Sequence, residues 1–262
     1  MSIYQKEIQI LGYQRSGLHA VANWIIGLYN SAVYKNDAGL GIYEGIYKPV
    51  LYLDGTVVGS FEEYPKGQAV LIGYESGSVQ NLRTCLNQEA YIQSRAECAA
   101  AAGEDTFADD RICVFNVRDP FNSLASAWKF FRDQKKVLQF SNLWLEYARE
   151  YVGETDYLKD IKHMFVLFNK WRSSEEYRRE LAAKLERPFN DRNLNKMLGY
   201  GSGSSFSGVT HKQDASKLDI ENRWKTFEGD DFYRSIFENR PEIVRLSKQV
   251  FDFVPPPFEH LL

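Results

Sequence analysis

The stretch Ile8–Trp24 reads IQILGYQRSGLHAVANW and predicts a strand, a tight loop and a helix, in that order. Its apolar start leads into the segment Gly12–Gly17, and apolar residues at helical spacing follow, among them Val21 and Trp24. Such a loop aims several backbone N–H groups and the positive end of a helix at one point. The stretch therefore favours a phosphate-binding site.

The spacing from Gly12 to Gly17 satisfies the G-x-x-x-x-G half of a Walker A loop. Where ATP and GTP enzymes then have Lys and Ser or Thr, this chain has Leu18 and His19. Because that hydroxyl ligates Mg²⁺ and that Lys reaches the phosphates, the sequence disfavours a Mg²⁺-bound triphosphate. Arg15 supplies a cation earlier in the loop, which favours a donor with fewer bridging phosphates and no metal. The alternative for this segment alone is a glycine turn in an ordinary α/β domain.

A second segment has the same strand-then-helix character. Ile112–Val117 is nearly all apolar, as expected of a strand buried on both faces of a parallel sheet. Arg118 follows it, with Asp119 as a candidate N-cap and Pro120 as a candidate first helical residue. Ser126 comes eight residues after Arg118, about two helical turns on, so the two can hold one phosphate together. The alternative is that Arg118 pairs with a carboxylate and Ser126 is a small packing residue.

Together the two segments resemble the sulfotransferase family of P-loop proteins, which transfer sulfonate from 3′-phosphoadenosine 5′-phosphosulfate (PAPS) to a hydroxyl or amine. Gln14–His19 occupies the place of the family's Pro-Lys-Ser-Gly-Thr-Thr-Trp-like loop, with Arg where Lys is usual and Leu-His where two Thr are usual. Arg118 and Ser126 match the second motif in residue type and spacing. Gly199–Gly208 matches, by position and flexibility, a third, glycine-containing loop, without the usual Arg-Lys-Gly.

The resemblance implies that PAPS is the co-substrate, that 3′-phosphoadenosine 5′-phosphate (PAP) is the product, and that no metal takes part. The first motif would bind the 5′-phosphosulfate, the second the 3′-phosphate, and the third would close over the nucleotide. The implied donor-binding residues are Arg15, Ser16, Gly17, Leu18, His19, Ala20, Arg118, Ser126, Ser204 and Ser205.

Catalysis needs a group that accepts the acceptor's proton and a cation that stabilises charge on the bridging oxygen. The resemblance gives the second role to Arg15. Glu75 is the first candidate for the base, because it follows an apolar strand and a buried carboxylate there would have a raised pKa. His19 is the second candidate, since imidazole titrates near neutrality. Further candidates are Glu44, Glu62 and Glu63.

Strands alternating with helices predict an α/β fold: a three-layer, P-loop NTPase-like domain with a central, mostly parallel sheet flanked by helices. Residues 1–262 are taken as one domain, in which 39–64 is an irregular insert that faces the substrate or forms a surface loop or small hairpin. The other predicted strands are Ala32–Lys35, Gln68–Tyr74 and His163–Phe168. The other predicted helices are Asn87–Ala102, an exposed Phe140–Tyr151, Ser173–Leu185, Ile220–Phe227 and Pro241–Phe251, with Pro255–Pro257 ending the last.

Composition narrows the partners. A net charge of −3 over 262 residues, without a basic run, argues against nucleic acid. The sequence has no apolar stretch of transmembrane length and no signal-peptide pattern, so we expect a cytoplasmic protein with no membrane span. Three widely spaced cysteines (Cys85, Cys98, Cys113) read as reduced thiols, and four scattered histidines show no metal-ligand spacing. The expected acceptor is a small molecule, a carbohydrate or a lipid; the oligomeric state stays open.

Two other functions are compatible with the sequence. A P-loop nucleotide or small-molecule kinase would share the fold and would need a Walker B-like Asp, for which Asp37 is the nearby candidate. A non-catalytic nucleotide-binding protein would retain a degenerate P-loop.

Overall fold

The computed structural model describes residues 4–35, 50–53, 56–60, 67–80, 110–196, 206 and 215–262; of 4, 35, 50–53, 56–60 and 67 it describes the backbone alone. The strands are β1 Tyr4–Gly12, β2 Ser31–Lys35, β3 Val50–Leu53, β4 Thr56–Ser60, β5 Gly67–Glu75, β6 Arg111–Val117 and β7 His163–Leu167. The helices are α1 Leu18–Gly27, α4 Pro120–Phe131, α5 Gln134–Val152, α6 Phe168–Ser173, α7 Glu175–Lys184, α8 Asp231–Glu238 and α9 Pro241–Phe251, with short 3₁₀ segments η1 Ala215–Lys217, η2 Arg223–Phe227 and η3 Pro256–Leu261.

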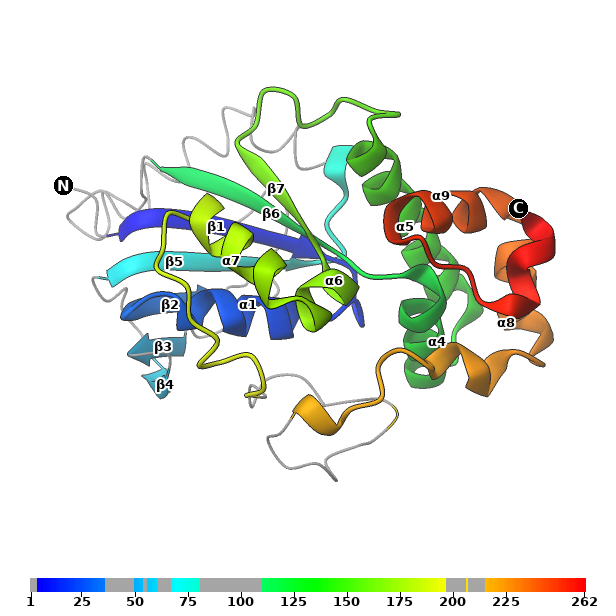
Figure 1. Cartoon of the computed structure of the whole chain (residues 1–262), viewed down its shortest axis with the longest axis horizontal. Helices are drawn as coiled ribbons and strands as arrows, with labels where there is room; N and C mark the ends of the chain where they lie inside the picture. Colours follow the sequence, from blue (N-terminus) through cyan, green and yellow to red (C-terminus); the bar gives the residue numbers. More distant parts are fainter. Residues whose placement is uncertain are drawn as a thin grey trace.

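The strands form one sheet in the order β4-β3-β2-β5-β1-β6-β7. From β2 to β7 all neighbours are parallel, whereas β3 and β4 pair antiparallel at one edge. The described part of the insert 39–64 is thus a small hairpin that extends the sheet. In Figure 1 the parallel strands point their carboxyl ends toward α4 and the C-terminal helices. The predicted α/β fold is confirmed.

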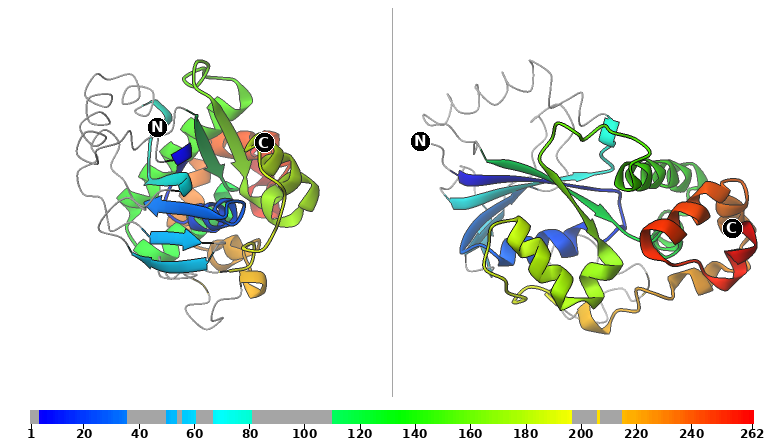
Figure 2. Two further views of the ribbon diagram at one scale, coloured as in Figure 1. Left: turned by 90° about the vertical axis from the view of Figure 1, so that its left-hand side faces the viewer. Right: turned by 45° about the horizontal axis from the view of Figure 1, so that its top comes forward.

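Two apolar clusters fill the space on the two faces of the sheet. One joins β1 to helices α1, α6 and α7 and contains Trp24 and Trp171. The other joins the opposite face to α4, α5, α8 and α9 and contains Trp144 and Phe237. Figure 2 shows α1, α6 and α7 together on one side of the sheet. The result is the expected layered arrangement, with helices on both faces.

Several predicted elements differ from the observed ones. The helix predicted as exposed at 140–151 is the longer α5, and its face of Val137, Phe140, Trp144 and Tyr147 is buried. The aromatic residues at helical spacing outweigh the charged residues between them. The proline run 255–257 does not end the helical region, because η3 begins at Pro256. Helices α6 and α8 were not predicted, and the predicted helix 87–102 lies outside the described residues.

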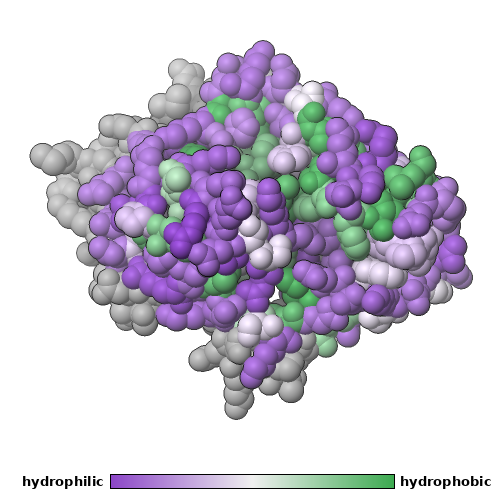
Figure 3. All heavy atoms as spheres, viewed as in Figure 1, coloured by the Kyte–Doolittle hydropathy of each residue, from purple (hydrophilic) through white to green (hydrophobic). Residues whose placement is uncertain are grey.

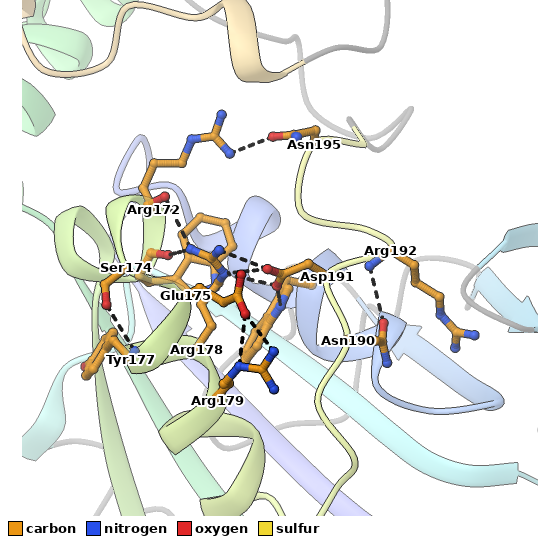
Figure 4. A network of polar contacts seen from close by, with 12 residues as sticks. Arg172, Ser174, Glu175, Tyr177, Arg178, Arg179, Asn190, Asp191, Arg192 and Asn195 are labelled. Carbon is orange, nitrogen blue, oxygen red and sulfur yellow. Dashed lines mark hydrogen bonds and ion pairs between the residues drawn. The ribbon is translucent and has the colours of Figure 1, made fainter.

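A strap of chain after α7 fastens α1 to the rest of the molecule. The buried guanidinium of Arg178 donates to both carboxylate oxygens of Asp191, and Trp24 of α1 donates to the same carboxylate at 2.9 Å. Next to this carboxylate along the chain, Asn23 and Asn193 exchange hydrogen bonds. Figure 4 shows Arg178 and Asp191 at the centre of this network. Helix α1, which follows the loop 12–17, is therefore tied through Trp24 to the ion pair of Arg178 and Asp191.

Gly17 precedes α1 in the left-handed region, with φ of 92°, and only glycine adopts that conformation without strain. A Cβ at this position would also lie 2.3 Å from the Phe168 ring of α6. The close approach of loop and ring therefore depends on Gly17 twice, through its backbone and through its missing side chain.

Gly17→Ala should lower the free energy of unfolding by about 2–5 kcal/mol, from backbone strain plus the clash with Phe168. Gly153→Ala is the matched control, because Gly153 has φ of 82° and no described atom lies within 4 Å of the place its Cβ would take. It should cost only the backbone strain, about 1–2 kcal/mol. Urea unfolding of both variants measures the difference, and equal losses would contradict the steric argument.

Candidate functional site

The loop 12–17, the end of β5 and the end of β6 meet at one edge of the sheet. Gly12 is the register partner of Glu75, and the backbone N–H of Ser76 donates to the Gly12 carbonyl at 2.7 Å. Arg15 and Ser76 both have left-handed backbones, with φ of 74° and 72°. Such strain in residues other than glycine concentrates at functional sites. Three parts of the predicted site, the loop 12–17, Glu75 and Arg118, therefore lie at this edge.

The loop offers backbone rather than side-chain groups to a ligand. Ser16 is fully buried, and its Oγ accepts a hydrogen bond from Asn116 of β6 at 3.1 Å. Leu18 packs into the core. The N–H of Ser16 donates to Tyr13, and that of Ala20 donates to Gly17. Of the residues 16–20 expected to bind phosphate, Ser16 and Ala20 therefore already donate their N–H groups within the protein.

Arg118 is buried directly under this loop. Its Nη1 lies 3.5 Å from the Arg15 carbonyl, its Nη2 donates to the Ile220 carbonyl, and its Cζ lies 5.1 Å from the Phe168 ring centre. Within the described ranges it forms no ion pair, and its buried Nε has no hydrogen-bond partner there. Burial lowers its pKa, which the charge of Asp119 partly offsets.

Arg223, at the start of η2, is a member of the site that sequence reasoning missed. Its Nη1 donates to Ser126 Oγ at 2.9 Å, and its Nε donates to the Asp219 carbonyl at 3.2 Å. Burial lowers its pKa to about 8, with the charges of Arg118 and Arg15 adding to the effect. In the sequence, Arg223 is one charged residue in the predicted helix 220–227. Nothing in that stretch indicates that it packs against α4.

Arg15 completes a cluster of three arginines, defined here as Arg15, Arg118 and Arg223. Burial lowers the pKa of Arg15 too, and next in size comes the charge of Arg118. An arginine stays protonated in water, so the lowered values reflect three cations gathered in a poorly solvated place. An oxyanion with two negative charges would relieve that repulsion, and guanidinium groups bind phosphate and sulfate oxygens well.

Next to the cluster, His19 and Glu75 form an ion pair with Nε2 and Oε1 2.9 Å apart. Burial raises the pKa of Glu75, but the hydrogen bonds from His19 and Gln14 and the charge of Arg15 outweigh burial, and the net shift is downward. The expected raised pKa is therefore wrong, because the loop supplies partners that the strand pattern did not show. Glu75 is an ionised carboxylate facing an imidazole.

The turn after Glu75 is fastened to α5. Tyr147 donates to the Gly77 carbonyl, and Ser78 donates to Glu146 at 2.7 Å. The His19 ring also makes an edge-to-face contact with the ring of Tyr34, with the ring centres 6.5 Å apart. Contacts with α5, through the turn, and with His19 of α1 thus help strand β5 to set the position of Glu75.

Some sequence candidates lie outside the described residues: Asp37, Glu44, Glu62, Glu63, Cys85, Cys98, Ser204 and Ser205. Cys113 is a buried free thiol. Among the residues that the structure describes, no cluster of three His, Cys, Asp or Glu side chains is suited to a metal ion. In that same part of the chain, no helix combines the length and the hydropathy needed to cross a bilayer.

A solved structure shares this architecture over nearly its whole length. The sulfotransferase domain of the olefin synthase of Synechococcus PCC 7002 superposes with a TM-score of 0.50, covering 98% of this chain and 98% of that chain at 12% identity. The chain has the fold of that domain. A sulfotransferase domain from the curacin biosynthetic pathway covers 88% of this chain and 96% of its own at 12% identity, with a TM-score of 0.42. No protein-family model and no curated protein sequence matches this chain.

Two buried arginines offer a test of the cluster. Arg223→Met removes one of three clustered cations, so it should leave stability unchanged or raise it in low salt. Arg178→Met removes a cation that is paired with Asp191, so it should cost about 3–5 kcal/mol. Thermal unfolding with and without pyrophosphate measures both effects. Pyrophosphate should stabilise wild type and Arg178→Met but should stabilise Arg223→Met much less.

Proposed function

We propose that the protein is a PAPS-dependent sulfotransferase that moves a sulfonate group to a hydroxyl of a small molecule, carbohydrate or lipid. The observation that carries the proposal is the arginine cluster, one member of which contacts Ser126, at the edge where the loop 12–17 meets β5 and β6. The fold shared with a sulfotransferase domain supports the same conclusion. Because Leu18 stands where the Walker A motif has its Lys and His19 where it has the hydroxyl that ligates Mg²⁺, a metal-free donor suits the loop better than a triphosphate.

The cluster suits the two anionic ends of such a donor. The 3′-phosphate would bind Arg118 and Arg223, with Ser126 Oγ, which already accepts from Arg223, as a further partner. The buried Nε of Arg118 has no hydrogen-bond acceptor among the described residues, so it is suited to donate to an anion. The 5′-phosphosulfate would bind the N–H groups at the start of α1, with Arg15 beside it.

The ion pair of His19 and Glu75 supplies the base. An ionised Glu75 fixes the imidazole through Nε2 and stabilises the imidazolium that forms, so the proton of the acceptor hydroxyl would be taken at Nδ1. His19 is then the catalytic residue, and Glu75 positions it. This reverses the order in which the sequence ranked the two candidates, because the Glu75 pKa is lowered.

Transfer is in line. The acceptor oxygen attacks sulfur as its proton passes to His19, the bond from sulfur to the bridging oxygen breaks, and PAP leaves with the electron pair on that oxygen. Arg15 stabilises this developing charge by hydrogen bonding and by its permanent positive charge. Because Arg does not release a proton at neutral pH, it acts here as a cation and not as an acid.

Arg118→Ala should weaken PAP binding by about 2–4 kcal/mol, because it removes a charge-assisted contact to a desolvated phosphate. Calorimetric titration without Mg²⁺ measures the loss. ATP, which lacks a 3′-phosphate, should bind wild type and variant equally weakly. Arg149→Ala, which removes a guanidinium bound to Glu242, is the control and should leave PAP affinity unchanged. Equal PAP affinity in wild type and Arg118→Ala would refute the assignment.

His19→Gln should lower turnover about 10²–10⁴-fold while PAP affinity changes little. Glu75→Gln should lower turnover less and should move the acid limb of the pH–rate profile to lower pH, because the imidazolium loses an anionic neighbour. Glu75→Asp should restore part of both effects. The measurement is PAPS turnover with a surrogate hydroxyl acceptor over a pH series. If Glu75→Gln and His19→Gln had equal losses and the limb did not move, Glu75 would be the base.

A further inference from the structure

Three residues of α4 at steps of four contact the arginine cluster, and Arg118 precedes the first of them by four residues. Arg118 belongs to the cluster itself. Asn122 Oδ1 accepts from the backbone N–H of Arg223 at 2.8 Å, and Ser126 Oγ accepts from its guanidinium at 2.9 Å. One turn further on, the ring of Phe130 lies 4.7 Å from the Cζ of Arg15. Residues four apart share one face of a helix, so α4 holds two arginines along a single stripe.

Phe130 differs from the other aromatic residues of α4. Its side chain is 45% exposed, whereas Phe121 and Trp128 of the same helix are buried. Its described contacts are Arg15 and the edge-on ring of Phe131, with ring centres 4.7 Å apart. A ring this exposed adds little to the core, so packing does not explain it. Figure 3 shows hydrophobic residues at the surface of this helical half among mainly hydrophilic ones.

The ring of Phe130 suits the position of Arg15 in the cluster. The charges of Arg118 and Arg223 repel that of Arg15, and the charge of Glu75 attracts it. A hydrogen-bonding partner would use up the N–H groups that a donor phosphosulfate requires. An aromatic face binds the flat face of a guanidinium and leaves its edge N–H groups for an oxyanion.

We propose that Phe130 is a positioning residue for the sulfonate donor: its ring holds the Arg15 guanidinium over the loop, with the N–H edge turned to the 5′-phosphosulfate. The inference rests on the proposed function. It adds a residue at the exposed end of α4 that acts on the donor only through Arg15.

A double-mutant cycle tests this. Phe130→Leu keeps an apolar side chain without a π face and should weaken PAP binding and PAPS turnover about two- to fivefold. Phe130→Tyr should restore both. In an Arg15→Met background, Phe130→Leu should have no further effect. Tyr151→Leu is the matched control, because Tyr151 is 40% exposed and has no described cation contact, and it should behave as wild type.

Each outcome decides between separate claims. If wild type binds PAP but Phe130→Leu is equally harmful with and without Arg15, or Phe130→Tyr does not rescue, Phe130 acts in another way and the inference is overturned. If wild type binds no PAP, the proposed function is wrong, and the inference falls with it. Thermal unfolding should show the Phe130 variants as stable as Tyr151→Leu, which separates a change in Arg15 from a loss of folding.

Discussion

The constraint on which the site depends is that three guanidinium groups lie together, mostly buried, at the carboxyl edge of a parallel sheet. Their described contacts are carbonyl oxygens, a hydroxyl and aromatic rings: Arg118 contacts the Ile220 carbonyl and the Phe168 ring, and Arg223 contacts Ser126. The charges of Asp119, Asp219 and Glu75 offset part of the repulsion among the three cations, and burial still lowers the pKa of each. Arg178 shows the contrast, since its charge is matched by Asp191 and it serves only to fasten the strap to α1. The edge keeps a positive field that the overall charge of −3 does not suggest.

Much of the C-terminal region serves to place one of these cations. Arg223 lies on a short 3₁₀ segment, which by itself has little stability. The segments beside it are tied to α4, because Trp128 donates to Asp230 and Tyr233 donates to the carbonyl of Phe121. Stacked rings of Phe121, Phe237 and Phe258 fill the space between them. Burying a cation costs desolvation free energy, and the packing of these residues holds Arg223 in place at a distance from its charge.

The sequence predicted what local signals determine. The strand, loop and helix at 8–24 and the strand, Arg118 and helix at 112–131 follow from apolar runs, glycines, an N-cap and a proline, which all act within a few residues. Arg223 and Phe130 could not be found that way, because their importance comes from contacts with residues about 100 positions away. Glu75 combines a property set by local sequence with one set by long-range contacts. Its place at the end of a buried strand was predictable, but its lowered pKa depends on Gln14 of the loop and His19 of α1, which the fold brings to it.

Leu18, which departs from the nucleotide-triphosphate motif, and Arg15, which stands where the sulfotransferase loop usually has Lys, both have physical reasons in the structure. The side chain of Leu18 points into the core, close enough to Gly12 that a Cβ there would meet it at 3.0 Å. Position 18 is where a nucleotide-triphosphate motif has its Lys, and here it is buried among apolar side chains, a place that suits Leu and not a charged amine. Arg15 has a planar group with two usable faces and an edge, whereas Lys has a single point charge. Only the planar group can contact Phe130 through a face and an oxyanion through its edge, so the loss of the Lys and the exposed ring on α4 are two parts of one arrangement.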